Sequence, residues 1–330
     1  MSALVDVKNL TLRFQTDEGV ITAIEDLSFS INQGEVLGLV GESGSGKSVA
    51  AKTLMRLMAK NAQIGEESCI TLHSEVGPVD VLSLRTAGEM RIVRGGAISM
   101  IFQEPMASFA PALSIGAQMV EQLRIHGDMS KARAKEISIE MLDRVGISDP
   151  ALRFGQYAFE LSGGMRQRAM IAMALSTKPK LLIADEPTTA LDVTLQEQVL
   201  DLMKDLISEF GMGVLFITHD LSVIAQTADR VAVMYLGRIV EEGPVRQVIG
   251  DPRHPYTQGL IKALPRIGGK GELTPISGDI PSPLQRPGGC VFHTRCSQVF
   301  GPCAAEIPSS VEISDGHSAA CHLYLDGDRK

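Results

Sequence analysis

The residues best suited to chemistry form one stretch, 41–48. It reads Gly41, Glu42, Ser43, Gly44, Ser45, Gly46, Lys47 and Ser48, which is the spacing of a phosphate-binding P-loop. The glycines let successive backbone N–H groups point at one anion, and the helix that follows adds its positive dipole end. Lys47 can reach the β- and γ-phosphates of a nucleotide, and the Ser48 hydroxyl can bind Mg²⁺. A Gly/Ser-rich turn without a ligand is disfavoured, because an apolar run, 36–40, and a helix-forming run, 50–58, flank the stretch.

Two adjacent carboxylates, Asp185 and Glu186, follow the apolar run 180–184. Asp185 can support Mg²⁺, and Glu186 can take the proton of an attacking water. The alternative is a solvated turn, but the run before the pair is typical of a strand buried on both faces. The pair therefore predicts a hydrolytic site.

Polar residues also end two other predicted strands, since Gln103 follows 97–102 and His219 follows 213–218. The carboxyl ends of strands line the ligand crevice of an open α/β sheet, so both side chains are candidates for the same site. Each signal is weak alone, because polar strand ends are common and a lone histidine is usually structural.

Two more segments have features of a ligand-binding site, but each also has a purely structural interpretation. Ser162, Gly163 and Gly164 open a predicted helix that runs to about residue 176. The N-terminus of such a helix can bind an anion, or the serine can simply cap the turn without any ligand. Phe14, near the end of a predicted strand, can stack on a nucleobase, although strand aromatics usually belong to a core.

Hydrophobic periodicity indicates the elements that must position these residues. Strands are predicted over 4–14 and 20–31, joined as a hairpin, and over 231–235 and 238–242, a second hairpin that finishes the main sheet. Segment 63–93 is expected to hold loops and short strands. Helices are predicted over 115–123 and 130–145, over 193–210, and from His254 to about 264.

Length and charge narrow the class of protein. With 330 residues the chain has room for one large domain and a smaller one, and we place the boundary near 250–270, where Pro and Gly become frequent. The net charge of −8 disfavours binding to nucleic acid or to anionic lipid. No apolar run approaches the roughly 18 residues that span a bilayer, and residues 1–6 lack a signal-peptide pattern. We therefore expect a cytoplasmic chain, held at a membrane only by partners.

Taken in order, these segments resemble an ATP-binding cassette (ABC) transporter ATPase over residues 1–250. The motifs that carry the resemblance are Walker A (Gly41–Ser48), the Q-loop residue Gln103, the signature (Leu161–Met165), Walker B (Leu181–Asp185) with Glu186, the D-loop (Ala190-Leu191-Asp192), the switch histidine His219 and an A-loop aromatic at Phe14. The resemblance implies an α/β P-loop NTPase fold with a RecA-like core, an antiparallel β flank and a helical subdomain at about 105–160.

The same resemblance implies residue roles in binding and hydrolysing ATP with Mg²⁺. Phe14 would stack on adenine, while Lys47 and the loop amides would hold the phosphates. Ser48, Gln103 and Asp185 would arrange Mg²⁺ and water. Glu186 would act as base, and His219 would position the γ-phosphate.

The tail, 251–330, looks like that of the oligopeptide/dipeptide/nickel importer branch, through His254-Pro255-Tyr256-Thr257 and its cysteines. That branch pairs two different ATPase subunits, and a signature with Met165 is typical of one of them. The resemblance implies a head-to-tail heterodimer, in which each ATP lies between Walker A of one chain and the signature of the other. It also implies two permease subunits, a periplasmic solute-binding protein and a peripheral location on the cytoplasmic side of the inner membrane.

Other functions stay open beside the peptide importer. Nickel and oligosaccharide-like solutes are alternatives within the branch, since the ATPase does not contact the solute. A soluble, non-transport ABC ATPase usually carries a long coiled-coil insertion or two cassettes, and this sequence has neither. The presence of Lys47, Glu186 and His219 together opposes a non-catalytic regulatory ATPase.

The tail holds four of the five cysteines, separated by five, six and seventeen residues: Cys290, Cys296, Cys303 and Cys321. A reducing compartment disfavours disulfides, and no pair has the C-x₂₋₄-C spacing usual for zinc. Four thiolates suit a [4Fe–4S] cluster, which some members of the resembling branch carry, with zinc or free thiols as alternatives. His293, His317 and His322 are further candidate zinc ligands. Because 265–330 holds few apolar residues, a metal would stabilise its fold.

Overall fold

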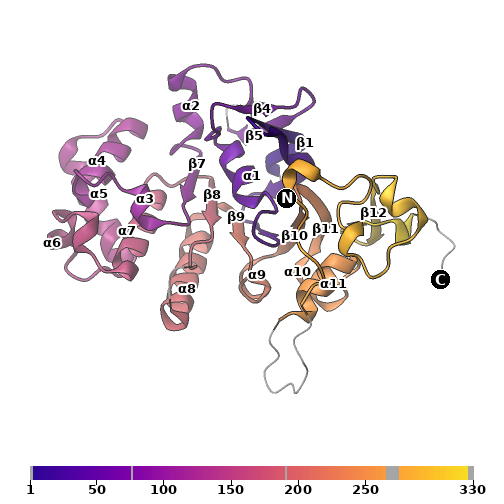
Figure 1. The fold of residues 1–330 in the computed structure, drawn as a ribbon. Helices are drawn as coiled ribbons and strands as arrows, with labels where there is room; N and C mark the ends of the chain where they lie inside the picture. The colour runs from indigo at the N-terminus through magenta and orange to yellow at the C-terminus, as the bar shows by residue number, and fades with distance from the viewer. Residues whose placement is uncertain (1–2, 76, 190–191, 265–274, 326–330) are drawn as a thin grey trace. The chain divides into compact units, whose positions relative to one another are not determined.

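The computed structural model describes residues 3–75, 77–189, 192–264 and 275–325 (Figure 1). The chain forms two compact units. The first consists of Met1–Val5, Ile31–Val36 and Leu72–Ile217, and the second of Asp6–Ser30, Leu37–Thr71 and Thr218–Lys330. The predicted D-loop residues Ala190 and Leu191 lie outside the described residues. The predicted domain boundary near residue 250 stays a prediction.

Parallel strands form the centre of the first unit: β7 (Ile98–Ile101), β8 (Leu181–Asp185) and β9 (Gly213–Thr218). Strand β8 lies between the other two, and all residues of these strands are buried. Apolar runs buried on both faces are typical of parallel sheets, and the predicted strands are confirmed. Because β7 and β8 run in the same direction, the residues that follow them come to one edge of the sheet.

Helices account for most of the remaining first unit. They are α2 (Ala87–Val93), α3 (Pro105–Ser108), α4 (Ile115–His126), α5 (Lys131–Arg144), α6 (Pro150–Phe154), α7 (Gly163–Ser176) and α8 (Val193–Phe210), with the 3₁₀ turn η1 (Ala158–Glu160). Figure 1 shows α4 to α7 gathered into one group, whose small core contains Val120, Leu123 and Ala134. The predicted helical segment after Pro105 is therefore confirmed.

Side-chain caps explain where several helices begin. Ser130 accepts a hydrogen bond from the Arg133 N–H at 3.2 Å at the start of α5, as the sequence predicted. The helix α2 was not predicted, although Thr86 and Glu89 have the spacing of a capping box. Both hydrogen bonds of that box are present, so this local motif starts a helix within a segment of mixed composition.

An antiparallel sheet contributes residues to both units. Its strands are ordered β2 (Gly19–Asn32), β1 (Ala3–Thr16), β5 (Cys69–Ser74) and β6 (Gly77–Asp80), and β4 (Ala62–Ile64) pairs with β1. The predicted hairpin of the first two strands and the antiparallel flank are confirmed.

The second unit also contains a mixed sheet that carries the glycine-rich loop. Strand β3 (Val36–Val40) is parallel to β10 (Arg230–Tyr235), which is antiparallel to β11 (Arg238–Pro244). The prediction that this hairpin finishes the sheet is wrong, because β13 (His317–Ala320) pairs with β11, and β12 (Ser310–Ser314) pairs with β13. A buried side-chain hydrogen bond joins the added strand to β11, since Glu241 Oε1 lies 2.7 Å from His317 Nε2.

The helices of the second unit are short. They are α1 (Lys47–Leu54), α9 (Leu221–Thr227), α10 (Val245–Gly250) and α11 (Pro255–Lys262), with the 3₁₀ turns η2 (Pro283–Gln285), η3 (His293–Arg295), η4 (Gly301–Ala304) and η5 (His322–Tyr324). The helix after the glycine-rich loop ends at Leu54, earlier than the predicted Met58. Within the described ranges, no helix is both long enough and apolar enough to cross a membrane.

Candidate functional site

The glycine-rich loop connects β3 to α1, in the predicted order strand, loop, helix. Glycine is required at both of its ends by close backbone contacts. A Cβ atom on Gly41 would lie 2.1 Å from the Met234 carbonyl oxygen, and one on Gly46, whose φ is 101°, would lie 2.7 Å from the Ala23 carbonyl oxygen. The Gly237 N–H also donates to the Ser45 carbonyl at 2.8 Å. The neighbouring strands therefore fix the shape of the loop through the backbone.

The Lys47 side chain lies inside this loop, and the residue is only 5% exposed. Its ammonium group donates to the Gly41 carbonyl at 2.6 Å, to the Glu42 carbonyl at 2.9 Å and to the Ser45 hydroxyl at 3.3 Å. Oxygen atoms of the loop thus surround the ammonium group. A phosphate oxygen of a bound nucleotide can replace one of them as the hydrogen-bond acceptor. Ser43 and Gly44 are exposed, which leaves backbone N–H groups accessible to an anion.

The first unit brings Gln103 and Glu186 into direct contact, whereas the strand-end argument predicted only that such residues lie at one edge of the sheet. Gln103 Nε2 donates to Glu186 Oε2 at 3.0 Å, and the Thr189 hydroxyl donates to the same oxygen at 3.0 Å. The two donors hold the carboxylate from the ends of adjacent parallel strands. Thr189 was missed by the sequence analysis, although it lies only three residues after Glu186.

The backbone at the end of β8 is unusual. Asp185 is 3% exposed. The next residue, Glu186, has a φ of 48°, in the left-handed region that residues with a side chain rarely adopt. Its N–H donates to the Ile217 carbonyl at 2.9 Å, so β9 holds this backbone in place. Such strain is often found where a side chain must point in a particular direction for function.

The segment Ser162–Gly164 begins α7 as predicted, with the Ser162 hydroxyl accepting from the Met165 N–H at 3.3 Å. Ser162 and Gly163 are exposed, so the helix start is accessible. Gln167 lies one turn further on and donates to the Pro187 carbonyl, directly after Glu186. Asp192 caps α8 through the Leu195 N–H at 3.0 Å.

The remaining predicted site residues lie in the second unit. Phe14 is half-buried on β1, where its backbone is in register with Ala62. His219 is exposed between the end of β9 and Asp220, the cap of α9. Their roles toward a nucleotide stay predictions.

Two family profiles match the chain. Residues 24–189 match the family described as ABC transporter, and residues 240–303 match the C-terminal region of oligopeptide/dipeptide transporters. The oligopeptide transport ATP-binding protein OppD of Escherichia coli K12 is 47% identical over 320 residues, which cover 97% of this chain and 93% of that protein. AppD of Bacillus subtilis 168 is 44% identical over 325 residues, which cover 98% of each chain.

The chain belongs to the ABC transporter family. A solved dimer of the ATP-binding cassette MJ0796, in a post-hydrolysis state bound to ADP and Pi, matches with a TM-score of 0.64 and 27% identity over 73% of this chain and 99% of that one. CbiO1 of Clostridium perfringens shares the fold, with a TM-score of 0.62 and 24% identity over 76% of this chain and 92% of its own. The predicted ABC ATPase fold is thus confirmed, and membership implies ATP with Mg²⁺ as the ligand of this ATPase.

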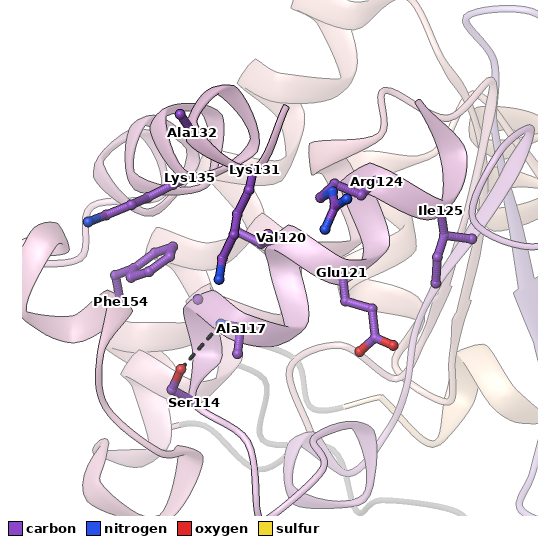
Figure 2. A pocket seen from close by; sticks show the side chains of 11 residues that line it. Ser114, Ala117, Val120, Glu121, Arg124, Ile125, Lys131, Ala132, Lys135 and Phe154 are labelled. Atoms are coloured by element: carbon purple, nitrogen blue, oxygen red, sulfur yellow. Dashed lines mark hydrogen bonds between the residues drawn. The ribbon is translucent and has the colours of Figure 1, made fainter. Parts of the chain in front are cut away.

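The ABC cassette also presents a groove on its helical group. The groove has a volume of about 920 Å³, and Figure 2 shows side chains from α4, α5 and α6 around it. Gly116 makes room for the Phe154 ring, which a Cβ atom would approach to 2.4 Å. The Lys135 ammonium lies 5.6 Å from the centre of that ring. Arg124 and Lys131 add positive charge to a partly apolar lining.

The C-terminal segment contacts Walker A through residue pairs that the sequence did not predict. The Tyr256 hydroxyl accepts from the Glu42 N–H at 2.8 Å, and the Arg295 guanidinium lies 2.7 Å from the Glu42 carboxylate. Burial alone would lower the pKa of Arg295, but hydrogen bonds and the charge of Glu42 outweigh it and raise that pKa. No spacing rule could have found these pairs, which are 214 and 253 residues apart.

Aromatic rings form the core beneath these contacts. The centre of the Tyr235 ring lies 4.7 Å from that of Tyr256 and 5.2 Å from that of Phe292. His254 packs against Phe292, and burial lowers the pKa of His254 to about 3. Because Phe292 and Val291 are buried, the expectation that the tail lacks apolar material for a core is wrong for this part.

The tail cysteines are all free thiols, and Cys290, Cys303 and Cys321 are buried. Burial raises the pKa of Cys290, Cys296 and Cys321, the last to about 11, and nearby thiols raise these pKa values further. The Cys290 N–H also donates to the Cys303 carbonyl at 2.8 Å, so the backbones of these two cysteines are adjacent. No group of three or more metal-ligating side chains in the described part of the chain is arranged to hold a metal ion. The donor set fits a cluster or zinc, but its arrangement is not that of a formed site.

Proposed function

We propose that this chain is the ATP-hydrolysing subunit that powers peptide import through a membrane ABC transporter. The observation that carries the proposal is the similarity, along nearly the whole chain, to ATP-binding proteins of oligopeptide transport. Nickel and oligosaccharide-like solutes remain alternatives, as does a non-transport ABC ATPase. Reconstitution with the permease subunits in vesicles tests this choice. ATP-dependent uptake of labelled peptides supports it, and uptake of nickel alone contradicts it.

The residues divide the work between holding ATP and hydrolysing it. Lys47 and the N–H groups of the loop hold the phosphates, and their backbone-fixed geometry avoids a cost of ordering on binding. Ser48 and Asp185 provide oxygen atoms for Mg²⁺. The Phe14 ring stacks on the adenine base.

Glu186 acts as the general base on the attacking water, and its removal costs about 10²–10⁴ in rate. The hydrogen bonds from Gln103 and Thr189 hold one of its carboxylate oxygens in place. His219 positions the γ-phosphate. Ser162, Gly163, Gly164 and Asp192 complete the site of a second chain in a dimer.

We assign that second chain to a different ATPase subunit. Met165 in the signature supports the assignment, and the dimeric state of the similar cassette MJ0796 supports pairing of two cassettes in general. Purified alone, the chain should hydrolyse ATP slowly and without cooperativity. A homodimer with full, cooperative turnover would contradict a required hetero-partner.

The helical group is the part that we assign to the two permease subunits, and the groove between α4, α5 and α6 offers them an apolar floor with a basic rim. A periplasmic binding protein would deliver the solute, and this chain would lie on the cytoplasmic side of the inner membrane. A photo-crosslinker at Ile125, which is 49% exposed, should capture a permease in the assembled transporter. Capture of no permease from this position would contradict the assigned surface.

For the tail we propose a [4Fe–4S] cluster on Cys290, Cys296, Cys303 and Cys321, with zinc as the alternative. Support comes from the number of free thiols in this segment and from the backbone contact between Cys290 and Cys303. The thiols would have to lose their protons and shift closer together, as metal-coupled folding requires. Anaerobically purified protein should absorb near 400 nm and contain about four irons per chain. Colourless protein with one zinc per chain would refute the cluster, and complete alkylation of the native thiols would refute both metals.

A further inference from the structure

The segment that carries the cysteines also contacts the nucleotide-binding loop. Arg295 ends the turn η3, directly before Cys296, and its side chain is 4% exposed. Its Nη1 lies 2.7 Å from one Glu42 carboxylate oxygen, and its Nη2 lies 3.2 Å from the other. A bidentate pair of this kind fixes both the position and the orientation of the carboxylate.

The backbone of the same glutamate is held as well. Tyr256, which is fully buried, accepts the Glu42 N–H at 2.8 Å, while the Glu42 carbonyl accepts from the Lys47 ammonium at 2.9 Å. The residue next to the first glycine of Walker A is therefore held by the tail on one side and by the phosphate-binding lysine on the other.

We propose that Arg295 and Tyr256 are positioning residues for Walker A, and that the C-terminal segment thereby sets the affinity for ATP. By fixing Glu42 they keep the first half of the loop in its binding shape before the nucleotide arrives. A preordered loop loses less conformational entropy on binding, so its ligand binds more tightly. Neither residue touches the phosphates, and the inference goes beyond the function proposed above because it concerns affinity rather than the solute.

The arginine is itself held rigidly, which a positioning role requires. Arg295 Nε donates to the Ser277 carbonyl at 3.1 Å, and its guanidinium carbon lies 5.8 Å from the centre of the Tyr235 ring. A lysine could keep the charge but neither the bidentate contact nor the planar stacking. Arg295→Lys should therefore restore only part of the affinity that a neutral side chain loses.

A second arginine of the same segment provides a matched control. Arg286 lies 2.7 Å from the Glu25 carboxylate, and its side chain is 15% exposed. It also donates to the Thr22 carbonyl at 3.4 Å. Both contacts are to β2 rather than to Walker A. Arg286→Met thus removes an ion pair of the same segment without touching the nucleotide-binding loop, while Glu25 keeps its contact with Arg238 at 3.0 Å.

The test measures equilibrium binding of a fluorescent ATP analogue and the melting temperature of the full-length chain. The variants are Glu42→Gln, Arg295→Met, their double variant and Arg286→Met. We expect each single change at the Glu42–Arg295 pair to weaken binding about tenfold, equivalent to about 1.4 kcal/mol. The double variant should bind no more weakly than either single variant, because both remove the same contact. Arg286→Met should stay within about twofold of the parent.

Unchanged affinity in Glu42→Gln and Arg295→Met would overturn the proposal. So would an equal loss in Arg286→Met, which would indicate a general loss of packing, or losses in the double variant that multiply. Should Arg295→Met fail to fold, Glu42→Gln together with Tyr256→Phe decides the question by the same affinity criterion. Lys47→Ala weakens ATP binding whether or not the tail positions the loop, so failure of this inference leaves the ATPase assignment intact.

Discussion

The Walker A loop and the Gln103–Glu186 pair are built in opposite ways. Backbone contacts shape the loop, whose end glycines lie against the carbonyl oxygens of Met234 and Ala23. Side-chain hydrogen bonds hold the pair, and Gln103 is exposed to solvent. Lys47, by contrast, is 5% exposed among loop oxygens.

This difference separates two tasks of an ATPase. A rigid backbone cradle suits tight binding, because little order is lost when the phosphates arrive. A carboxylate held by neighbouring side chains can shift its contacts as water and substrate come into place. Substitutions in the loop should therefore change affinity, and substitutions in the pair should change rate.

The largest effect is expected for the general base. Glu186→Gln keeps the size of the side chain but removes the proton acceptor, so ATP hydrolysis in the assembled transporter should fall by about 10²–10⁴. ATP should still bind, and the closed complex with the partner subunit should accumulate. Glu104→Gln is the matched control, since its side chain is exposed and makes no capping hydrogen bond at the start of α3. Hydrolysis at the parental rate in Glu186→Gln would show that another group is the base.

The next effect is on affinity. Lys47→Ala removes a charged donor worth about 1.5–3 kcal/mol, so the dissociation constant for ATP should rise roughly 10- to 100-fold. Lys52→Ala, an exposed position on the same helix, should bind ATP like the parent. Equilibrium titration of both variants makes the comparison. Equal affinities would mean that the loop amides alone hold the phosphates.

The third effect is on stability rather than on ATP, and it tests the aromatic core beneath the loop. His254 has a pKa of about 3 when folded, against an ordinary value of 6.5, because burial disfavours its charged form. Between those values the unfolded chain binds a proton that the folded chain does not. Stability therefore falls as the pH drops below about 6.5, by at most about 1.4 kcal/mol per pH unit.

In the parent, the Tyr256 N–H donates to His254 Nδ1 at 3.1 Å. His254→Asn keeps an acceptor for this hydrogen bond. In urea unfolding between pH 7 and pH 4, this variant should take up one proton fewer on unfolding than the parent does. Its unfolding free energy should therefore depend less steeply on pH. An unchanged pH dependence would show that a group other than His254 takes up the proton on unfolding.

Local patterns predicted the elements that carry the site. Continuous apolar runs predicted β8 and β9, the helix over Val193–Phe210 has its predicted bounds, and Ser162 begins α7 as expected. The parallel sheet then accounts for the contact between Gln103 and Glu186, because strand ends meet at one edge.

Long-range contacts were not predictable in the same way. Glu42 reads as one of the variable positions of a P-loop, and Arg295 as a surface residue of a loop-rich tail. Their contact depends on how β10, β11 and α11 pack, which spacing along the chain does not encode. The addition of β13 to β11 was missed for the same reason, since it depends on Glu241 and His317 pairing across 76 residues.

The central claim is that binding and hydrolysis are separable properties of the two regions. Glu186→Gln and Lys47→Ala should be compared in one pair of measurements on the assembled transporter: equilibrium ATP binding, then single-turnover hydrolysis at saturating ATP. The account predicts that Glu186→Gln binds like the parent and hydrolyses at least about 100-fold more slowly. It predicts that Lys47→Ala loses most of its activity through affinity. Parallel losses of affinity and rate in Glu186→Gln would contradict this separation.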